Sequence, residues 1–199
     1  MTLHADALSL LTSWSAPDAG QESLRSRYVA HLAAHPDGLT RGCYPDHLTA
    51  STLVMSEDGE QVLLTLHAKA HQWFQFGGHC EPGDRTLADA ARREAVEESG
   101  LPDLVLDPVP VQLSEHEVPF CDPRGGVHHL DVRFLALAPP DAAHSVSAES
   151  LDVRWWPADV LPDPQPDMVD LVRLARHRLA QSQSTSDSPG GGSSLAAAE

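Results

Sequence analysis

The chain has 199 residues, of which 41% are hydrophobic, and this is enough for one domain whose core needs neither disulfides nor a structural metal. Its 13 lysines and arginines face 29 aspartates and glutamates, and the formal net charge of −16 repels a phosphate backbone, which excludes extended nucleic acid as a partner. A phosphorylated small molecule can still bind, provided that a divalent cation lies between the two negative partners.

The start of the chain and its cysteines indicate the compartment. Residues 1–11 lack a basic beginning and a sustained apolar run, so we expect neither a signal peptide nor a membrane span. Cys43, Cys80 and Cys121 are odd in number and widely spaced, which argues against a disulfide framework and against a CxxC-type zinc site. We therefore expect reduced thiols in a cytoplasmic protein.

Two helices are predicted first, over residues 5–14 and 21–34, because both segments show helical spacing of apolar residues. A loop rich in Pro, Gly and Asp follows them. We interpret residues 1–44 as an N-terminal helical extension.

A β-hairpin is expected next, formed by strands at 48–55 and 61–67 around an Asp-Gly turn. A short apolar run at 73–76 then leads into a glycine-rich loop. Residues 86–98 are typical of a helix, with Thr86 and Asp89 as a capping pair.

Beyond Gly100, which ends that helix, three strands and one helix are predicted in the order 103–114, 127–138, 151–156 and 167–181. Strands interleaved with few helices indicate an α+β architecture with a mixed sheet. The main domain is expected to span 45–181. Residues 182–199 contain almost no large apolar side chain, and we expect a disordered tail.

The helix at 86–98 carries glutamates on its inward face. Its apolar stripe begins at Leu87 and Ala91, and at about 100° per residue Glu94 and Glu98 fall within roughly 40° of the same line. Glu97 lies beside them, so three carboxylates converge on one patch. Like charges at this spacing oppose helix formation by about 0.2–0.5 kcal/mol per pair.

Arg92 and Arg93 can offset part of this charge, and hard divalent cations prefer such oxygen ligands. For an isolated EAVEE segment, a solvated acidic helix end is the alternative interpretation. The context favours a site, because an apolar run ends at Gly77-Gly78 and a tight glycine-containing loop then precedes the helix. This order lets backbone approach a ligand beside the acidic patch.

Residues 78–101 resemble the box of the Nudix hydrolase family, G-x5-E-x7-R-E-U-x-E-E-x-G-U, where U is aliphatic. The second half matches closely, as R-E-A-V-E-E-S-G-L at residues 93–101. In the first half, Asp84 stands where the family has glutamate, and eight residues rather than seven separate it from Arg93. The departure concerns the loop more than the three later glutamates, which are the more central metal ligands in the family.

The resemblance implies an α/β/α sandwich, with a mixed sheet between helices, that hydrolyses the diphosphate linkage of a nucleoside diphosphate joined to another moiety. It implies Mg²⁺ or Mn²⁺ bound by Glu94, Glu97 and Glu98, with the Gly78 carbonyl as a further ligand. Arg93 is expected to orient the glutamates. The expected catalytic residues are therefore Glu97, Glu94 and Arg93.

The general base is less closely defined by the resemblance, because family members use either a glutamate of the box or one from a later loop. Our first choice is Glu97. The alternatives are Glu115, Glu117 and Glu149.

Residues outside the box are candidates for binding the substrate. His129, Asp131 and Arg133 alternate along one strand and share a face, which either reads the substrate or is an exposed strand face. Arg85 in the loop can reach a phosphate, although a solvated side chain is its commoner role. Three tryptophans can stack a base or pack in the core: Trp73, Trp155 and Trp156.

The chain also has twelve histidines, including His67, His71 and His79 near the glycine-rich loop. They raise the possibility of a transition-metal site, but no metal-ligand spacing in the sequence supports one.

Two other functions are compatible with the same fold. A non-catalytic sensor that binds a nucleotide commonly shows an eroded glutamate set or an attached DNA-binding domain, and neither is visible. An isoprenoid diphosphate isomerase needs a catalytic cysteine, for which Cys80 and Cys43 are poorly placed. We therefore expect a small-molecule diphosphate as the partner, and no membrane. A homodimer stays open because dimers are frequent among such enzymes.

Overall fold

Eight strands form one mixed sheet in the computed structural model, which describes residues 1–140, 142–148 and 150–186. The strands are β1 (Asp46–Ser56), β2 (Gln61–His67), β3 (Trp73–Phe74), β4 (Phe76–His79), β5 (Val105–Leu106), β6 (Gln112–Glu117), β7 (His128–Ala138) and β8 (Ser150–Pro157). The main path is β3-β2-β1-β7-β5, with β4 on β1, β6 on β7 and β8 on β2. β1 and β7 run parallel along the whole of β1, and the other pairs are antiparallel.

The expected hairpin is confirmed, since β1 and β2 pair around a turn in which Gly59 has a φ of 73°. The short apolar run at 73–76 belongs to β3 and β4. The single strand expected at 103–114 was wrong, because β5 and β6 form in its place. Pro108 and Pro110 lie between them, and neither has an N–H to donate to a neighbouring strand.

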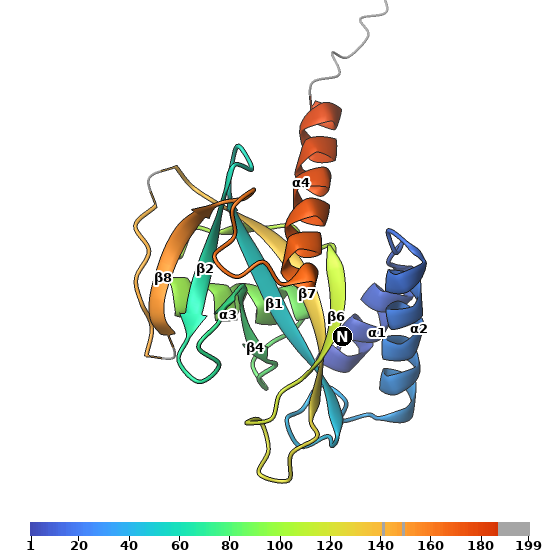
Figure 1. The fold of residues 1–199 in the computed structure, drawn as a ribbon. Coiled ribbons are helices and arrows are strands. Elements are labelled where there is room, and N and C mark those ends of the chain that lie inside the picture. Colours follow the sequence, from blue (N-terminus) through green and yellow to red (C-terminus); the bar gives the residue numbers. More distant parts are fainter. Residues whose placement is uncertain (141, 149, 187–199) are drawn as a thin grey trace, which may run out of the picture.

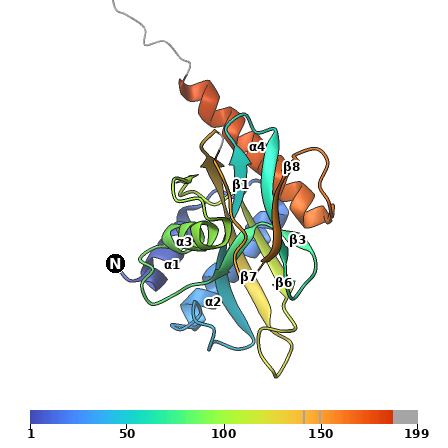
Figure 2. The ribbon, with the colours of Figure 1, turned by 90° about the vertical axis from the view of Figure 1, so that its left-hand side faces the viewer.

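In the described part of the chain, four helices flank the sheet: α1 (Leu3–Ser13), α2 (Ala19–Ala34), α3 (Leu87–Ser99) and α4 (Pro166–Ser186). α3 and α4 cover opposite faces (Figures 1 and 2), which confirms the predicted α/β/α sandwich. α4 continues past the expected end at residue 181, and residues 187–199 of the predicted tail lie outside the described ranges. Within those ranges, no helix combines the length and the apolar character that crossing a membrane requires.

Successive side chains of β1 point to opposite faces of the sheet, and each face packs against a different helix. Leu53 and Met55 belong to the hydrophobic cluster beneath α4, and Val54 belongs to the cluster beneath α3. Thr52 lies on the α3 side as well, where its hydroxyl donates to the Ala91 carbonyl at 3.0 Å. The sheet therefore holds α3 rigidly by one face.

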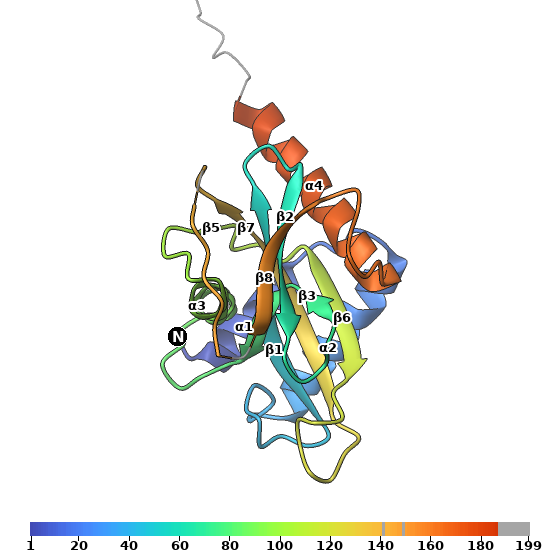
Figure 3. The same ribbon diagram turned by 60° about the vertical axis from the view of Figure 1, so that its left-hand side comes forward.

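The N-terminal helices pack directly on the main domain, and α1 lies beside α3 (Figure 3). Asp6 Oδ2 accepts a hydrogen bond from the Leu87 N–H at 3.0 Å, at the first turn of α3. Gln21 exchanges two side-chain hydrogen bonds with the backbone of Leu113, at 2.6 and 2.9 Å. A negative charge at the N-terminus of α3 stabilises that helix, so the extension supports the element that carries the glutamates.

Candidate active site

Local capping fixes both ends of α3. The Thr86 side chain accepts from the Asp89 N–H, and the Asp89 side chain accepts from the Thr86 N–H, which confirms the expected capping pair as a full capping box. At the other end, Gly100 adopts the left-handed conformation with a φ of 72°. The three glutamates thus lie in the last two turns of a well-defined helix.

Two glycines of β4 lie against two of these glutamates. Gly77 donates its N–H to Glu98 Oε1 at 3.0 Å. Gly78 lies so close to Glu94 that an added Cβ would be 2.7–2.9 Å from the Glu94 carboxylate. Gly78 is therefore needed for close approach between strand and helix, as the order of the sequence suggested, whereas a Cβ at Gly77 would overlap Ser51 of β1.

Arg93 connects the glutamates to the loop that precedes α3. Its Nη1 lies 3.0 Å from Glu94 Oε1 and 3.2 Å from Glu97 Oε2, while Nε and Nη2 each lie 3.1 Å from an Asp84 oxygen. Nη2 also donates to the His79 carbonyl at 3.0 Å. Hydrogen bonding to Asp84 is the largest cause of the raised pKa of Arg93. Asp84 thus provides a two-point contact that anchors Arg93, despite its shorter side chain and the inserted loop residue.

The three carboxylates differ in exposure. Glu98 is only 8% exposed, the Glu94 side chain is 17% exposed, and the Glu97 side chain is 59% exposed. Hard oxygen donors suit Mg²⁺ or Mn²⁺, and the absence of a Cβ at Gly78 leaves room for the Glu94 carboxylate beside the strand. The residues present therefore fit the cation that the box implies, and Glu97 is the carboxylate most accessible from solvent.

The strand residues His129, Asp131 and Arg133 do share one face of β7, as expected, but that face is not exposed. Asp131 is 3% exposed and Arg133 is 4% exposed. Four side chains donate hydrogen bonds to Asp131: Thr49, Ser51, Gln75 and Arg133. Arg133 Nη1 also lies 2.6 Å from Asp167 of α4. This buried network joins β1, β7 and α4, and the exposed-face interpretation was wrong for these two residues.

Burial alone raises the pKa of the Asp131 carboxyl, but Arg133, His116 and the Ser51 hydroxyl outweigh it and hold this pKa below its usual value. Asp131 is therefore a charged partner of Arg133 inside the protein. A role for His129, Asp131 and Arg133 in substrate binding stays a prediction, as does that of Arg85, whose side chain is exposed in the loop before α3.

The alternative bases differ in their surroundings. Glu115 Oε1 lies 2.9 Å from Arg27 of α2, so an ion pair already holds it on the N-terminal side of the domain. Glu117 is exposed at the end of β6, and Glu149 lies outside the described residues.

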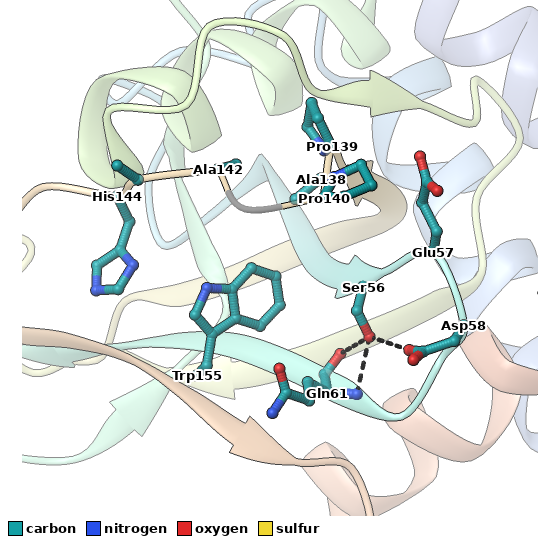
Figure 4. Close-up of a pocket in the computed structure, with 11 residues that line it drawn as sticks. Ser56, Glu57, Asp58, Gln61, Ala138, Pro139, Pro140, Ala142, His144 and Trp155 are labelled. Atoms are coloured by element: carbon teal, nitrogen blue, oxygen red, sulfur yellow. Dashed lines mark hydrogen bonds between the residues drawn. The ribbon is translucent and has the colours of Figure 1, made fainter.

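A pocket of about 740 Å³ opens beside the β1–β2 turn (Figure 4). Its walls come from the β1–β2 turn, including Glu57, and from the segment after β7, including His144, and Trp155 projects into it. None of the three α3 glutamates lines it. Trp73 and Trp156 instead pack edge to face at 5.3 Å beside the α4 cluster, which agrees with the packing interpretation.

Comparison with known families and structures identifies the family and the fold. A family model described as the NUDIX domain matches residues 45–176. No curated protein matches the chain.

Solved structures show the same fold. An Ap4A hydrolase from C. elegans, in a binary complex, aligns with 67% of this chain and 98% of its own, at 22% identity and a TM-score of 0.56. A NUDIX-family hydrolase from Clostridium perfringens aligns with 66% and 97%, at 22% identity and a TM-score of 0.53. The NUDIX domain of NrtR from Shewanella oneidensis, complexed with ADP ribose, aligns with 66% and 87%, at 26% identity and a TM-score of 0.50.

Proposed function

The chain belongs to the NUDIX family, and from this premise we propose that it is a metal-dependent hydrolase that cleaves the diphosphate linkage of a nucleoside diphosphate derivative. The observation that supports this most strongly is the arrangement of Glu94, Glu97 and Glu98 around Arg93 and the β4 glycines. Like charges on one helix end are unfavourable by themselves, and a cation-binding role explains why all three occur together.

The chain's own groups have distinct tasks in this proposal. Glu94 and Glu98 hold the cation as the less exposed ligands, and the Gly77 N–H fixes the direction of Glu98. Arg93 is a positioning residue, because it ties Glu94 and Glu97 to Asp84. When bound, Mg²⁺ or Mn²⁺ would neutralise charge on the diphosphate and lower the pKa of a bound water.

Glu97 is our choice for the general base. Its exposed carboxylate can accept a proton from a water that approaches the diphosphate from solvent, and it lies on the same helix as Glu94 and Glu98. Glu115 instead lies beside Arg27 of α2. The attack of that water on phosphorus would yield two phosphorylated products.

The isomerase alternative finds no support in the cysteines. Cys80 packs against the hydrophobic cluster on the α3 side of the sheet, and burial raises the pKa of its thiol to about 12. Cys43 is buried as well. One observation favours the sensor alternative, namely the likeness to the NUDIX domain of NrtR, which was solved in complex with ADP ribose. The test must therefore separate nucleotide binding from turnover.

The test is release of phosphate-containing products from a panel that includes a dinucleoside polyphosphate, ADP ribose, oxidised nucleoside triphosphates and nucleotide coenzymes, with Mg²⁺ or Mn²⁺. Wild type is compared with Glu98→Gln, which removes a charge but keeps an oxygen for the Gly77 N–H. We expect at least a ~100-fold lower rate. Glu57→Gln is the matched control, since it removes one carboxylate from the pocket of Figure 4, which the three glutamates do not line, and should leave the rate within about threefold.

Equal rates for wild type and Glu98→Gln would contradict the proposal, and a selective loss in Glu57→Gln would move the site to the pocket of Figure 4. Equal binding of a nucleotide to wild type and Glu98→Gln without any turnover would favour the sensor.

A further inference from the structure

Three histidines and one cysteine meet at the end of the sheet, outside the carboxylate helix. His47 comes from β1, His79 from the end of β4, His129 from β7 and Cys121 from the β6–β7 connection. One ligand atom from each lies within 4.8 Å of every other. We propose that this histidine–cysteine cluster is a zinc site, distinct from the cation site of the three glutamates.

Four of the six distances between the ligand atoms are those of direct contacts, and they lie near the distances around a tetrahedral ion. Zn–N bonds of about 2.0–2.1 Å and a Zn–S bond of about 2.3 Å place two nitrogens ~3.3 Å apart, and a nitrogen and a sulfur ~3.6 Å apart. The Nε2 atoms of His47 and His79 are 3.1 Å apart. Cys121 Sγ lies 3.5 Å from His79 Nε2, 3.9 Å from His47 Nε2 and 3.4 Å from His129 Nε2.

The histidines are also presented in the state that binds metal. His47 Nδ1 lies 3.1 Å from the Cys43 carbonyl, which can only accept, so Nδ1 carries the proton and Nε2 offers its lone pair to the cluster. Burial, the largest cause in each case, lowers the pKa of His79 to about 4 and that of His129 to about 3. Both rings are therefore neutral at pH 7.

The chemistry of the four donors distinguishes this site from the carboxylate helix. Imidazole and thiolate ligands select zinc and other borderline or soft ions, whereas Mg²⁺ prefers oxygen. Binding would replace the thiol proton of Cys121, released to solvent, with a Zn–S bond, and no redox step is involved. Four protein ligands close the coordination sphere, which is typical of a structural rather than a catalytic zinc.

The ion would tie the β6–β7 connection to three strands, β1, β4 and β7, which already pair with one another through β1. In Figure 1 the β6–β7 connection extends beyond the ends of β1 and β7, and Cys121 would anchor it. His79 would be held from two sides, since its carbonyl already accepts from Arg93 at 3.0 Å. Zinc would thus stabilise the start of the loop that leads into the carboxylate helix.

A second group of possible ligands provides a control. His35, Asp37 and Cys43 also place ligand atoms within 4.8 Å of one another, but they number only three, and two of them are exposed. If zinc bound there, Cys43 rather than Cys121 would supply the sulfur.

The test uses the full-length chain without an affinity tag, stripped of metal with a chelator and titrated with Co²⁺ and then Zn²⁺. We expect the cluster to bind one ion per chain, with tetrahedral Co²⁺ bands in the visible and a thiolate-to-Co²⁺ charge-transfer band in the near ultraviolet. Cys121→Ser should lose the charge-transfer band and weaken Zn²⁺ binding at least ~100-fold. Cys43→Ser and Glu98→Gln should keep the band and stay within about threefold of the wild-type affinity.

Alkylation of the wild-type protein supplies a readout that needs no variant. Bound Zn²⁺ should protect Cys121 from iodoacetamide, as mapped by mass spectrometry, more strongly than it protects Cys43. Absence of saturable Zn²⁺ binding, a charge-transfer band that survives Cys121→Ser, or a Zn²⁺ affinity lost in Glu98→Gln would each overturn the proposal. The outcome does not depend on hydrolysis, so it can fail or succeed separately from the proposed function.

Discussion

The carboxylate helix and the histidine–cysteine cluster are in contact through His79, whose carbonyl accepts from Arg93 and whose ring belongs to the cluster. The two sites differ in how the sequence supplies their residues. Glu94, Glu97 and Glu98 come from two turns of one helix, so a short stretch of sequence already places them together. The ligands of the cluster come from four separate segments between residues 47 and 129. The comparison teaches that a site on one helix is visible as spacing, whereas a site at the end of a sheet becomes visible only when its strands pair.

The largest effect that would test this comparison is expected from Arg93→Ala. The change removes the contacts to Glu94, Glu97 and Asp84 together, so we expect hydrolysis to fall about 100-fold, mainly in kcat, with a higher Mg²⁺ concentration needed for half-maximal rate. Steady-state kinetics at varied Mg²⁺ measure both quantities.

Arg93→Lys is the matched variant. It keeps the charge but cannot make the two-point contact with Asp84, so it should recover only part of the rate. Full recovery by lysine would show that charge alone, and not positioning, is what Arg93 supplies.

An intermediate effect is expected at the two glycines. In Gly77→Ala the new Cβ would overlap Ser51 of β1, including its backbone, and we expect a loss of about 2 kcal/mol in the free energy of unfolding. In Gly78→Ala the new Cβ meets the end of the flexible Glu94 side chain. We therefore expect less than about 1 kcal/mol in stability, but about tenfold slower hydrolysis.

Urea unfolding and product-release assays of both glycine variants check this pair. The contrary outcome is that Gly78→Ala loses as much stability as Gly77→Ala while hydrolysis stays at the wild-type rate. That outcome would show that the contact between Gly78 and Glu94 serves packing only, and that hydrolysis does not depend on the observed position of the Glu94 carboxylate.

The smallest effect should come from Cys121→Ser on hydrolysis, measured with excess Mg²⁺ at a temperature where the variant is folded. The observed contact from the cluster to the carboxylate helix runs through the His79 carbonyl, so we expect kcat to fall by less than about tenfold. Cys43→Ser is the control for loss of a thiol. A decrease as large as that of Arg93→Ala would mean that the bound zinc takes part in the reaction.

Several elements could be predicted because their signals are local. The helix at 86–98, its Thr86 cap and its Gly100 end all follow from short-range backbone chemistry, and α3 has them. The strand expected at 103–114 was wrong because Pro108 and Pro110 lie inside it, and a residue without an N–H cannot donate a hydrogen bond to a neighbouring strand.

The sequence by itself determined the family resemblance, the sandwich of helices around a mixed sheet, and the placement of three carboxylates on one helix face. Only the tertiary structure decided that Asp131 and Arg133 are buried partners and not an exposed face, and that Asp6 caps the carboxylate helix. The tertiary structure also decided that three histidines and one cysteine, far apart in the sequence, lie together at one end of the sheet. The physical reason is that helical spacing and capping act over a few residues, while the parallel pairing of β1 with β7 brings together side chains about 80 residues apart, as in the hydrogen bond from Ser51 to Asp131.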